Sequence, residues 1–183
     1  MKVVVLAGPE SSGKSTLGKA LAERFQAPLV GEYVREFIGQ QQRDTCFADI
    51  DTIARKQLQR ELEGRARRPA LLLLDTHLLS NKLWSEVLFH QSPPWLDTAL
   101  QAQHYDLIAL LSPHGLPWQA DGQRCQPALA ERQRFHQQME RWLHAHQQPV
   151  LHLDGSWQHR YQLLESAIEA LLQGSPADRS PKP

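Results

Sequence analysis

The most constraining feature of the sequence is the segment of residues 8–16, which follows an apolar run at residues 3–7. It matches the pattern G-x-x-x-x-G-K-[ST], and its residues are Gly8, Pro9, Glu10, Ser11, Ser12, Gly13, Lys14, Ser15 and Thr16. Glycines in this pattern let main-chain N–H groups curl around an anion, and the following helix adds its dipole. The lysine reaches the terminal phosphates of a nucleotide, and Ser15 is the expected ligand of Mg²⁺. A glycine-rich turn without a nucleotide is the alternative, and the flanking strand and helix disfavour it.

The order of the remaining elements indicates an α/β fold. Short apolar runs alternate with segments of helical periodicity, which is typical of a parallel sheet covered on both faces. The predicted strands are residues 3–7, 29–32, 71–75, 107–112 and 150–153. The predicted helices are residues 14–26, 50–64, 79–88, 135–146 and 157–171. We therefore expect a three-layer P-loop NTPase fold: a five-stranded parallel sheet, helices on both faces and a small lid.

Length and composition favour one domain and disfavour several classes of protein. We expect one P-loop kinase domain over residues 1–173 and a disordered tail at 174–183. The 20 basic and 20 acidic residues cancel, which argues against binding to nucleic acid or an anionic membrane through a basic excess. No apolar run approaches the length of a membrane span. The separate cysteines, Cys46 and Cys125, indicate no disulfide framework or zinc site, so a reduced, cytoplasmic protein is expected.

Two common classes of P-loop protein do not fit the sequence. A GTPase would carry Asp-x-x-Gly after the third strand and Asn-Lys-x-Asp for guanine, but no glycine follows Asp75 in that pattern and Trp84 replaces the second aspartate. A motor ATPase usually has a second acid directly after the first, where this chain has Thr76. The type that remains is a small kinase with a core sheet, an acceptor pocket and a mobile lid that carries an arginine.

Two carboxylates stand at predicted strand ends, where ligands of an open parallel sheet collect. Asp75 is expected to position Mg²⁺ or its water and to help deprotonate the acceptor hydroxyl; the alternative is a helix N-cap. Glu32 is expected to bind acceptor hydroxyls or to serve as the base. Its alternative is a solvated helix face shared with Arg35 and Glu36.

The polar segment of residues 113–125 is the predicted lid. Arg124 is the candidate for neutralising charge on the transferring phosphoryl group. Arg132 and Arg134 are secondary candidates for the same role, although surface positions on a solvated helix are favoured for both. Trp118 either faces a flat ligand ring or covers the core, and the sequence leaves both readings open.

The turn before the last predicted helix is a candidate for contact with the nucleotide base. It contains Gly155 and Trp157. The turn follows the last strand, so it lies at the carboxyl edge of the sheet. Trp157 fits equally well as a core residue on the apolar stripe of its helix.

A series of short motifs continues along the chain beyond the P-loop. The filling Pro-Glu-Ser-Ser is followed by Glu-Tyr-Val-Arg-Glu at 32–36, Asp-Thr at 75–76, Lys-Leu-Trp-Ser-Glu at 82–86, Tyr-Asp-Leu at 105–107 and Pro-Trp-Gln-Ala-Asp-Gly-Gln-Arg at 117–124. In this order, from residue 3 to about 172, the motifs resemble the ribosylnicotinamide kinase domain of NadR-type proteins. Those proteins often carry an adenylyltransferase domain before the kinase, and some carry a DNA-binding segment. Neither is expected here, because the P-loop strand starts at residue 3.

The resemblance implies an enzyme of NAD salvage. It implies transfer of the γ-phosphoryl group of ATP or GTP to the 5′-hydroxyl of nicotinamide riboside, with Mg²⁺ as cofactor. That acceptor is a cation with a ribose diol, which suits carboxylates and aromatic faces. The candidate acceptor residues are Glu32, Asp75, Asp121, Tyr33, Trp84, Trp118 and Arg35. A nucleoside monophosphate acceptor would need several arginines at the second strand end, where only Arg35 is close.

Two other functions stay open at this point. A regulatory nucleotide-binding protein would use occupancy to control a partner and would phosphorylate nothing. A polynucleotide 5′-kinase would need a basic groove, and the cluster Arg65, Arg67 and Arg68 is expected to form a solvated loop instead. We expect a small-molecule partner, with no membrane and no nucleic acid; the acceptor, the donor base and the oligomeric state stay open.

Overall fold

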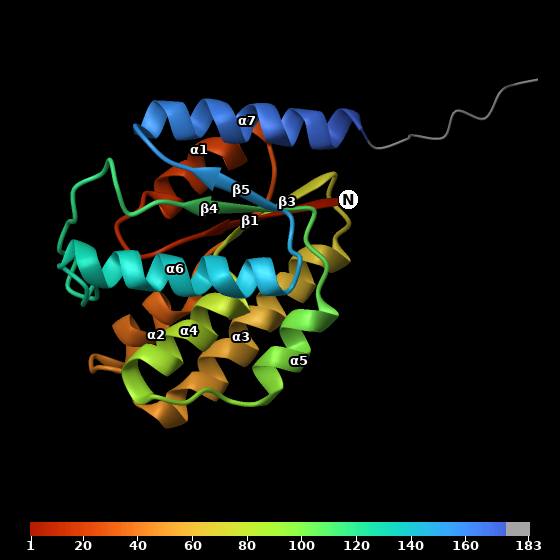
Figure 1. Cartoon of the computed structure of the whole chain (residues 1–183). Coiled ribbons are helices and arrows are strands. Elements are labelled where there is room, and N and C mark those ends of the chain that lie inside the picture. Colours follow the sequence, from red (N-terminus) through yellow and green to blue (C-terminus); the bar gives the residue numbers. More distant parts are fainter. Residues whose placement is uncertain (175–183) are drawn as a thin grey trace, which may run out of the picture.

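A parallel β-sheet forms the centre of the protein. The computed structural model describes residues 1–174. The strands are β1 (Lys2–Ala7), β2 (Leu29–Val30), β3 (Leu71–Asp75), β4 (Leu107–Leu111) and β5 (Val150–Leu153), in the order β2-β3-β1-β4-β5 across the sheet. All pairings are parallel, so the carboxyl ends of the strands meet at one edge. That edge is on the left in Figure 1.

Helices cover both faces of the sheet. They are α1 (Lys14–Phe25), α2 (Tyr33–Gln41), α3 (Phe47–Ala66), α4 (Leu78–Phe89), α5 (Trp95–Ala102), α6 (Leu129–Ala145) and α7 (Trp157–Gln173). Helices α1 and α7 lie on one face, and α3 to α6 lie on the other (Figure 1). Helix α2 packs on α3, farther from the sheet. No helix within residues 1–174 has both the length and the hydropathy needed to cross a membrane.

The two-sided cover explains the composition of the central strands. In β1, Val3 and Val5 pack toward α3 to α6, whereas Val4 and Leu6 pack toward α1 and α7. Every residue of β3 is buried. A strand covered on both faces needs apolar side chains at successive positions, so it appears as a continuous apolar run and not as an alternation. The predicted α/β P-loop fold is confirmed.

The differences from the predicted elements lie in short segments. Helices α2 and α5 were not predicted. Glu32 was predicted to end a strand, whereas β2 ends at Val30 and Glu32 stands at the N-cap of α2. Helices α3 and α6 both begin earlier than predicted. Helix α2 buries only Phe37, and α5 has eight residues, so neither shows a long apolar period. The boundary at residue 173 stays a prediction, and the predicted tail lies outside the described residues except for Gly174.

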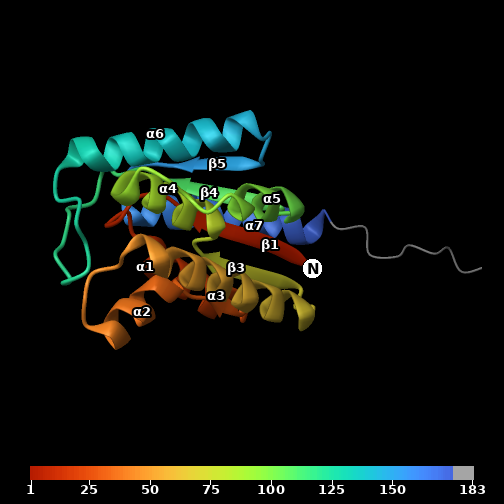
Figure 2. The same ribbon diagram turned by 90° about the horizontal axis from the view of Figure 1, so that it is seen from below.

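Three segments gather at the carboxyl edge of the sheet. They are the P-loop, the segment from Gly31 to Cys46 that includes α2, and the segment of residues 112–128 between β4 and α6. Figure 2 shows the last of these extending from the end of β4 toward α1 and α2. Because open parallel sheets bind ligands at this edge, these segments define where a functional site is expected.

Candidate active site

The P-loop has the backbone that its glycines predict. Gly8 has φ 141° and Gly13 has φ 88°, both in the region that favours glycine. A Cβ atom on Gly8 would lie 2.6 Å from the carbonyl oxygen of Leu111, so only glycine fits against β4. The Ser12 hydroxyl donates a 2.8 Å hydrogen bond to the Pro9 carbonyl across the loop. These contacts fix a main-chain curve at the N-terminus of α1, the geometry that binds phosphate.

The ammonium group of Lys14 lies inside this curve. Nζ donates hydrogen bonds to the carbonyl oxygens of Gly8, at 2.9 Å, and Pro9, at 2.7 Å. Burial lowers the pKa of Lys14, and the carboxylates of Glu32 and Asp75 oppose that effect. A partly buried ammonium is stabilised by acceptors and opposite charges, and this site supplies both. Lys14 is therefore held at the place where a polyphosphate would bind.

Asp75 ends β3 beside the P-loop and is 5% exposed. Its Oδ1 atom has no hydrogen-bond partner among the residues that the structure describes. The N-cap of α4 is His77, so Asp75 is not committed to capping that helix. Mg²⁺ commonly takes one or two protein oxygens and keeps several waters. The free carboxylate oxygen of Asp75 and the Ser15 hydroxyl therefore fit a magnesium ion bound together with nucleotide phosphates.

Metal binding by protein side chains alone is not indicated in the part of the chain that the structure describes. Residues 1–174 hold no cluster of three or more His, Cys, Asp or Glu side chains with the arrangement of a metal site. A magnesium ion at Asp75 and Ser15 would depend on phosphate oxygens for further ligands, as is common for Mg²⁺ in phosphoryl-transfer enzymes.

Glu32 faces the P-loop from the start of α2. Its side chain makes no capping hydrogen bond, and Oε2 accepts one from Arg35 Nε at 3.1 Å. Burial raises the pKa of Glu32, although Lys14 and Arg35 act in the opposite direction. The solvated-face interpretation applies instead to Glu36, which pairs with Arg60 at 2.5 Å on the outer side of α2. Glu32 is thus a partly buried carboxylate with a raised pKa, the property expected of a general base.

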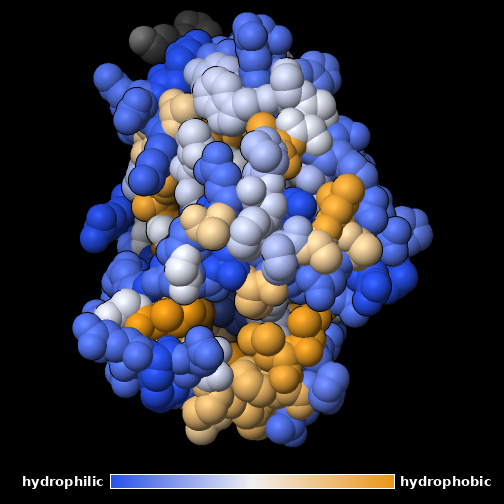
Figure 3. Space-filling view, turned by 90° about the vertical axis from the view of Figure 1, so that its left-hand side faces the viewer, coloured by the Kyte–Doolittle hydropathy of each residue, from blue (hydrophilic) through white to orange (hydrophobic). Residues whose placement is uncertain are grey.

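A single cavity joins the P-loop to an apolar pocket. It has a volume of about 400 Å³, and residues 10–16 of the P-loop line one end. Trp84 lines the other end, together with Val34, Ile38, Ile50, Ile53, Leu88 and Phe89. The Trp84 ring lies 4.8 Å from that of Phe135, which holds it in place. Figure 3 views this edge of the molecule, where apolar surface gathers on the lower side, the side of α2 to α4.

The predicted lid is attached to both ends of this cavity. On the P-loop side, Glu10 accepts hydrogen bonds from Trp118 Nε1 at 2.8 Å, from Gln126 N at 2.7 Å and from Cys125 N at 3.1 Å. On the α2 side, Asp121 pairs with Arg35 at 2.8 Å. The lid segment therefore spans the site from the phosphate loop to α2.

Arg124 lies on this lid and lines the cavity. Its Nη1 donates to the Gln119 carbonyl at 2.6 Å, and its Nε lies 3.0 Å from Asp121 Oδ2. Asp121 thus lies between Arg124 and Arg35, and Arg35 in turn contacts Glu32. A chain of alternating charges connects the lid to the carboxylate that faces Lys14.

The structure brings many, but not all, of the predicted site residues together. The predicted residues that line the cavity are Glu10, Ser11, Ser12, Gly13, Lys14, Ser15, Thr16, Glu32, Arg35, Trp84 and Arg124. The predicted residues outside its lining are Gly8, Pro9, Tyr33, Asp75, Trp118, Asp121, Gly155 and Trp157. Of these, Gly8 and Pro9 face Lys14 through their carbonyls, and Asp121 acts through Arg35.

Three aromatic or basic residues lie differently from what their sequence context suggested. Tyr33 packs under the guanidinium of Arg60, 4.7 Å from its ring, on the outer side of α2. Trp118 donates to Glu10, so it secures the lid. Arg132, expected on the surface, is 5% exposed because it lies one turn before buried Phe135 on the inner face of α6.

Most residues of the acceptor end were not predicted as site residues. Ile50, Ile53, Leu88 and Phe89 line the cavity although their helical periodicity indicates only core positions. Asp44 and Thr45 come from the connection between α2 and α3, which carries no motif. Asn81, one helical turn beyond His77 in α4, also lines the cavity. The only sequence signal for Asn81 as a site residue is its polar side chain on an otherwise apolar stripe of α4.

Comparison with known proteins now identifies the family. The AAA_28 sequence model, described as an AAA domain, matches residues 3–160. The chain belongs to this AAA-domain family. The match covers β1 to the first turn of α7, so the AAA domain contains every segment of the cavity. The family description names a type of domain and no reaction.

Two curated relatives of this AAA domain carry the same name. Each is a trifunctional NAD biosynthesis/regulator protein NadR, one from Salmonella typhimurium and one from Escherichia coli. Each is 27% identical to the chain over 139 residues, which is 74% of this chain and 34% of the relative. The chain thus spans about a third of the length of the curated relatives it matches.

Solved structures share the fold. A NadR protein in complex with NR has a TM-score of 0.73 and 23% identity, over 99% of this chain and 54% of that one. A deoxyadenosine kinase from M. mycoides has a TM-score of 0.67 and 12% identity, over 92% of this chain and 99% of that one. The similarity to NadR-type proteins that the motifs predicted is therefore confirmed in both sequence and fold.

Proposed function

We propose that the protein transfers the γ-phosphoryl group of ATP or GTP to the 5′-hydroxyl of nicotinamide riboside, a step of NAD salvage. The observation that supports this proposal is that Lys14 and Glu32 line one cavity, which joins a phosphate-binding loop to an apolar pocket. Asp75 lies behind that lining, close enough to act on the charges of both groups. A kinase for a small alcohol needs these two compartments to meet at one point.

The P-loop would bind the nucleoside triphosphate that donates the phosphoryl group. Its main-chain N–H groups and Lys14 would hold the β and γ phosphates, and Ser15 and Asp75 would hold Mg²⁺. The ion, when bound with the nucleotide, supplies neutralisation of phosphate charge. Arg124 on the lid would add a positive charge as the γ-phosphoryl group moves. Gly155 and Trp157, which follow β5 at the same edge, are retained as candidates for contact with the base.

Glu32 and the apolar pocket would bind and deprotonate the acceptor. The 5′-oxygen would attack the γ-phosphorus, the bond from that phosphorus to the bridging oxygen would break, and the hydroxyl proton would pass to Glu32. Burial raises the pKa of Glu32, which makes its carboxylate a stronger base than an exposed glutamate. The pyridinium ring would lie against Trp84, whose face suits a flat cation.

The relatives support this acceptor. One solved NadR structure contains NR and another contains NAD and AMP-PNP, the latter with a TM-score of 0.72 to this chain. We take NR to be nicotinamide riboside, a cation with a flat ring that suits the carboxylate and aromatic side chains of the pocket. The deoxyadenosine kinase fold favours other nucleosides as the second candidate class. A role in NAD salvage also carries the expectation of a cytoplasmic location.

One experiment tests the proposal directly. The purified protein is incubated with Mg-ATP or Mg-GTP and with nicotinamide riboside, purine and pyrimidine nucleosides, nucleotides or an oligonucleotide, and phosphate transfer is followed. We expect transfer to nicotinamide riboside with the highest kcat/KM of the panel. A higher kcat/KM for another nucleoside would reassign the acceptor, and no transfer to any member would favour a regulatory nucleotide-binding protein.

The structure gives the oligonucleotide little support as a substrate. Arg65, from the tight basic cluster, lies near the C-terminal end of α3, where it pairs with buried Glu61 at 2.7 Å. It also donates to the carbonyl of His104, just before β4 begins. Both contacts are at the amino edge of the sheet, opposite the cavity.

A further inference from the structure

Arg160 is a buried arginine that the proposed reaction does not use. It lies in the first turn of α7 and is 1% exposed, which places it among the largest fully buried side chains of the protein. A buried guanidinium is rare because its charge and its five N–H groups all need partners. The partners of Arg160 therefore indicate why an arginine stands there.

Those partners are main-chain carbonyl oxygens of three loops. Nη1 donates to Ser12 O of the P-loop at 2.9 Å and to Ser112 O after β4 at 3.0 Å. Nη2 donates to His114 O, and Nε donates to Gly155 O, before α7, at 3.0 Å. One side chain thus connects the phosphate loop to the two turns that follow β4 and β5.

The shape of these turns is built around the contact. Gly115 has φ 80° and Gly155 has φ 79°, conformations that favour glycine. A Cβ atom on Gly115 would lie 2.5 Å from the carbonyl oxygen of Gly155 and 3.4 Å from Arg160 Nη2. The two turns touch because Gly115 has no side chain in the way, and their contact closes the space around the guanidinium.

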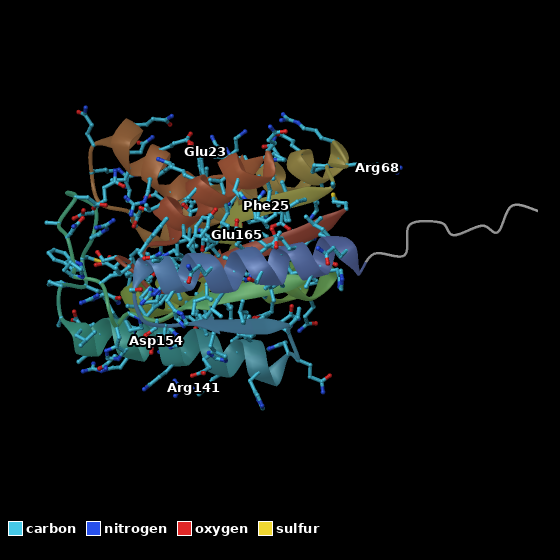
Figure 4. All side chains as sticks on the ribbon, turned by 90° about the horizontal axis from the view of Figure 1, so that it is seen from above. Glu23, Phe25, Arg68, Arg141, Asp154 and Glu165 are labelled. Atoms are coloured by element: carbon cyan, nitrogen blue, oxygen red, sulfur yellow. The ribbon has the colours of Figure 1, made fainter. Side chains whose placement is uncertain are left out.

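The charge of Arg160 is not neutralised by a close carboxylate. Among the described residues, the nearest acidic partner is Asp154, whose Oδ1 lies 4.0 Å away and whose side chain is 72% exposed. Asp154 is labelled in Figure 4 at the end of β5. Burial lowers the pKa of Arg160, but a guanidinium keeps its proton at neutral pH. A full positive charge therefore lies directly behind the P-loop.

We infer that Arg160 is a positioning residue for the nucleoside triphosphate: it orients the Ser12–Gly13 peptide and adds a fixed positive charge behind the phosphate site. The carbonyl of Ser12 points at Arg160, and the C=O and N–H of a trans peptide point in opposite directions. The N–H of Gly13 therefore points away from Arg160, and Gly13 lines the cavity. The hydrogen bond to Ser12 thus holds that N–H toward the phosphates.

This inference rests only on the nucleotide-binding half of the proposed function, so it is tested without an acceptor. The affinity for AMP-PNP with Mg²⁺ is measured by titration calorimetry for the parent protein, Arg160→Met and Arg160→Lys. We expect Arg160→Met to raise Kd by about tenfold or more, since it loses charge-assisted hydrogen bonds. Arg160→Lys keeps the charge but cannot reach all three loops, so we expect an intermediate Kd, raised by roughly threefold.

A matched control separates positioning from loss of stability. Leu164→Ala removes a fully buried side chain one turn farther along α7, away from the P-loop. Like Arg160→Met, it should lower Tm, because contacts of a buried side chain are lost. All titrations are made well below the Tm of each variant. An AMP-PNP Kd within twofold of the parent for Arg160→Met, or for folded Arg160→Lys if the Met variant does not fold, would overturn the inference. Failure to phosphorylate nicotinamide riboside would not affect it.

Discussion

The two ends of the cavity are built in different ways. The donor end is one continuous segment, residues 8–16, whose contacts are mostly main-chain atoms fixed by glycines, by Ser12 and by Arg160. The acceptor end is assembled from side chains of α2, α3, α4 and the lid. A main-chain site depends on backbone geometry, whereas a side-chain site changes with each residue. Substitutions at the donor end should therefore affect every reaction of the protein, and those at the acceptor end should act on one substrate.

The largest effect is expected for Lys14→Ala at the donor end. Loss of the ammonium that lies within the P-loop removes charge stabilisation from the transferring phosphoryl group. We expect kcat to fall by about 10³-fold for every acceptor. The measurement is phosphate transfer with Mg-ATP, and circular dichroism confirms that the fold is intact.

Lys19 provides the matched control for Lys14. It is an exposed lysine on the same helix, α1, outside the cavity lining. Lys19→Ala should keep the parental kcat. Normal turnover by Lys14→Ala would contradict the assignment of the P-loop as the donor site.

The second effect, Glu32→Gln, tests the point where the two ends meet. We expect kcat to fall by about 10²-fold because the amide cannot accept the hydroxyl proton. Affinity for AMP-PNP should change little. In the parent, activity should be lost as the pH falls through the pKa of Glu32, which burial raises above its ordinary value of 4.5. That acid limb of the kcat/KM profile should be absent from the residual activity of Glu32→Gln.

Glu36→Gln is the control for this carboxylate. Glu36 lies one turn along α2 and pairs with Arg60 on the outer side of the helix. Its pKa is lowered, with the Arg60 hydrogen bond as the main cause, so it cannot produce the same acid limb. If Glu32→Gln retained the parental acid limb, the base would be another group, with Asp75 as the first candidate.

The contrast between the two ends also explains what the sequence could predict. The P-loop, Asp75 and the buried strands were predictable because each follows a local pattern: fixed glycines, or an apolar run that ends in an acid. Glu32 was singled out at a strand end, and although it begins a helix, the segment still faces the P-loop. A local pattern can therefore indicate where a site residue lies even when the strand or helix that contains it is assigned wrongly.

The apolar pocket was not predictable in the same way. Ile50 and Ile53 have the spacing of ordinary core residues, and no neighbouring residue in the sequence indicates that this part of α3 faces a cavity. Arg132 and Arg160 have the sequence context of surface arginines, yet both are buried. Arg132 lies on the inner face of α6, and Arg160 bonds to the P-loop and to the turns after β4 and β5. Tertiary packing decides such cases, and it is absent from the periodicity of any single helix.

The third effect, Trp84→Leu, tests whether the acceptor end is selective. The smaller side chain removes the flat face over which the pyridinium would lie, so we expect KM for nicotinamide riboside to rise by about tenfold. KM for ATP should stay within twofold. Trp142→Leu is the matched control, because Trp142 stacks on His146 near the far end of α6. Equal changes in the two KM values would remove the distinction between the two ends.

The smallest effect is expected where the lid joins the donor end. Glu10→Gln leaves one oxygen for three donors and places an amide against the N–H of Cys125. The lid should then detach from the P-loop more often. We expect kcat to fall by about fivefold, the size of one net hydrogen bond. Trypsin should also cleave faster after Arg124, which the lid carries.

Proteolysis distinguishes the lid from the P-loop as the origin of this effect. Glu23→Gln changes an exposed glutamate on α1, labelled in Figure 4, that does not line the cavity, and it should leave both kcat and cleavage unchanged. If Glu10→Gln lowered kcat without faster cleavage after Arg124, Glu10 would act on the phosphates and not on the lid. Faster cleavage with a normal AMP-PNP affinity would instead show that the lid is held from the donor end while the P-loop keeps its shape independently.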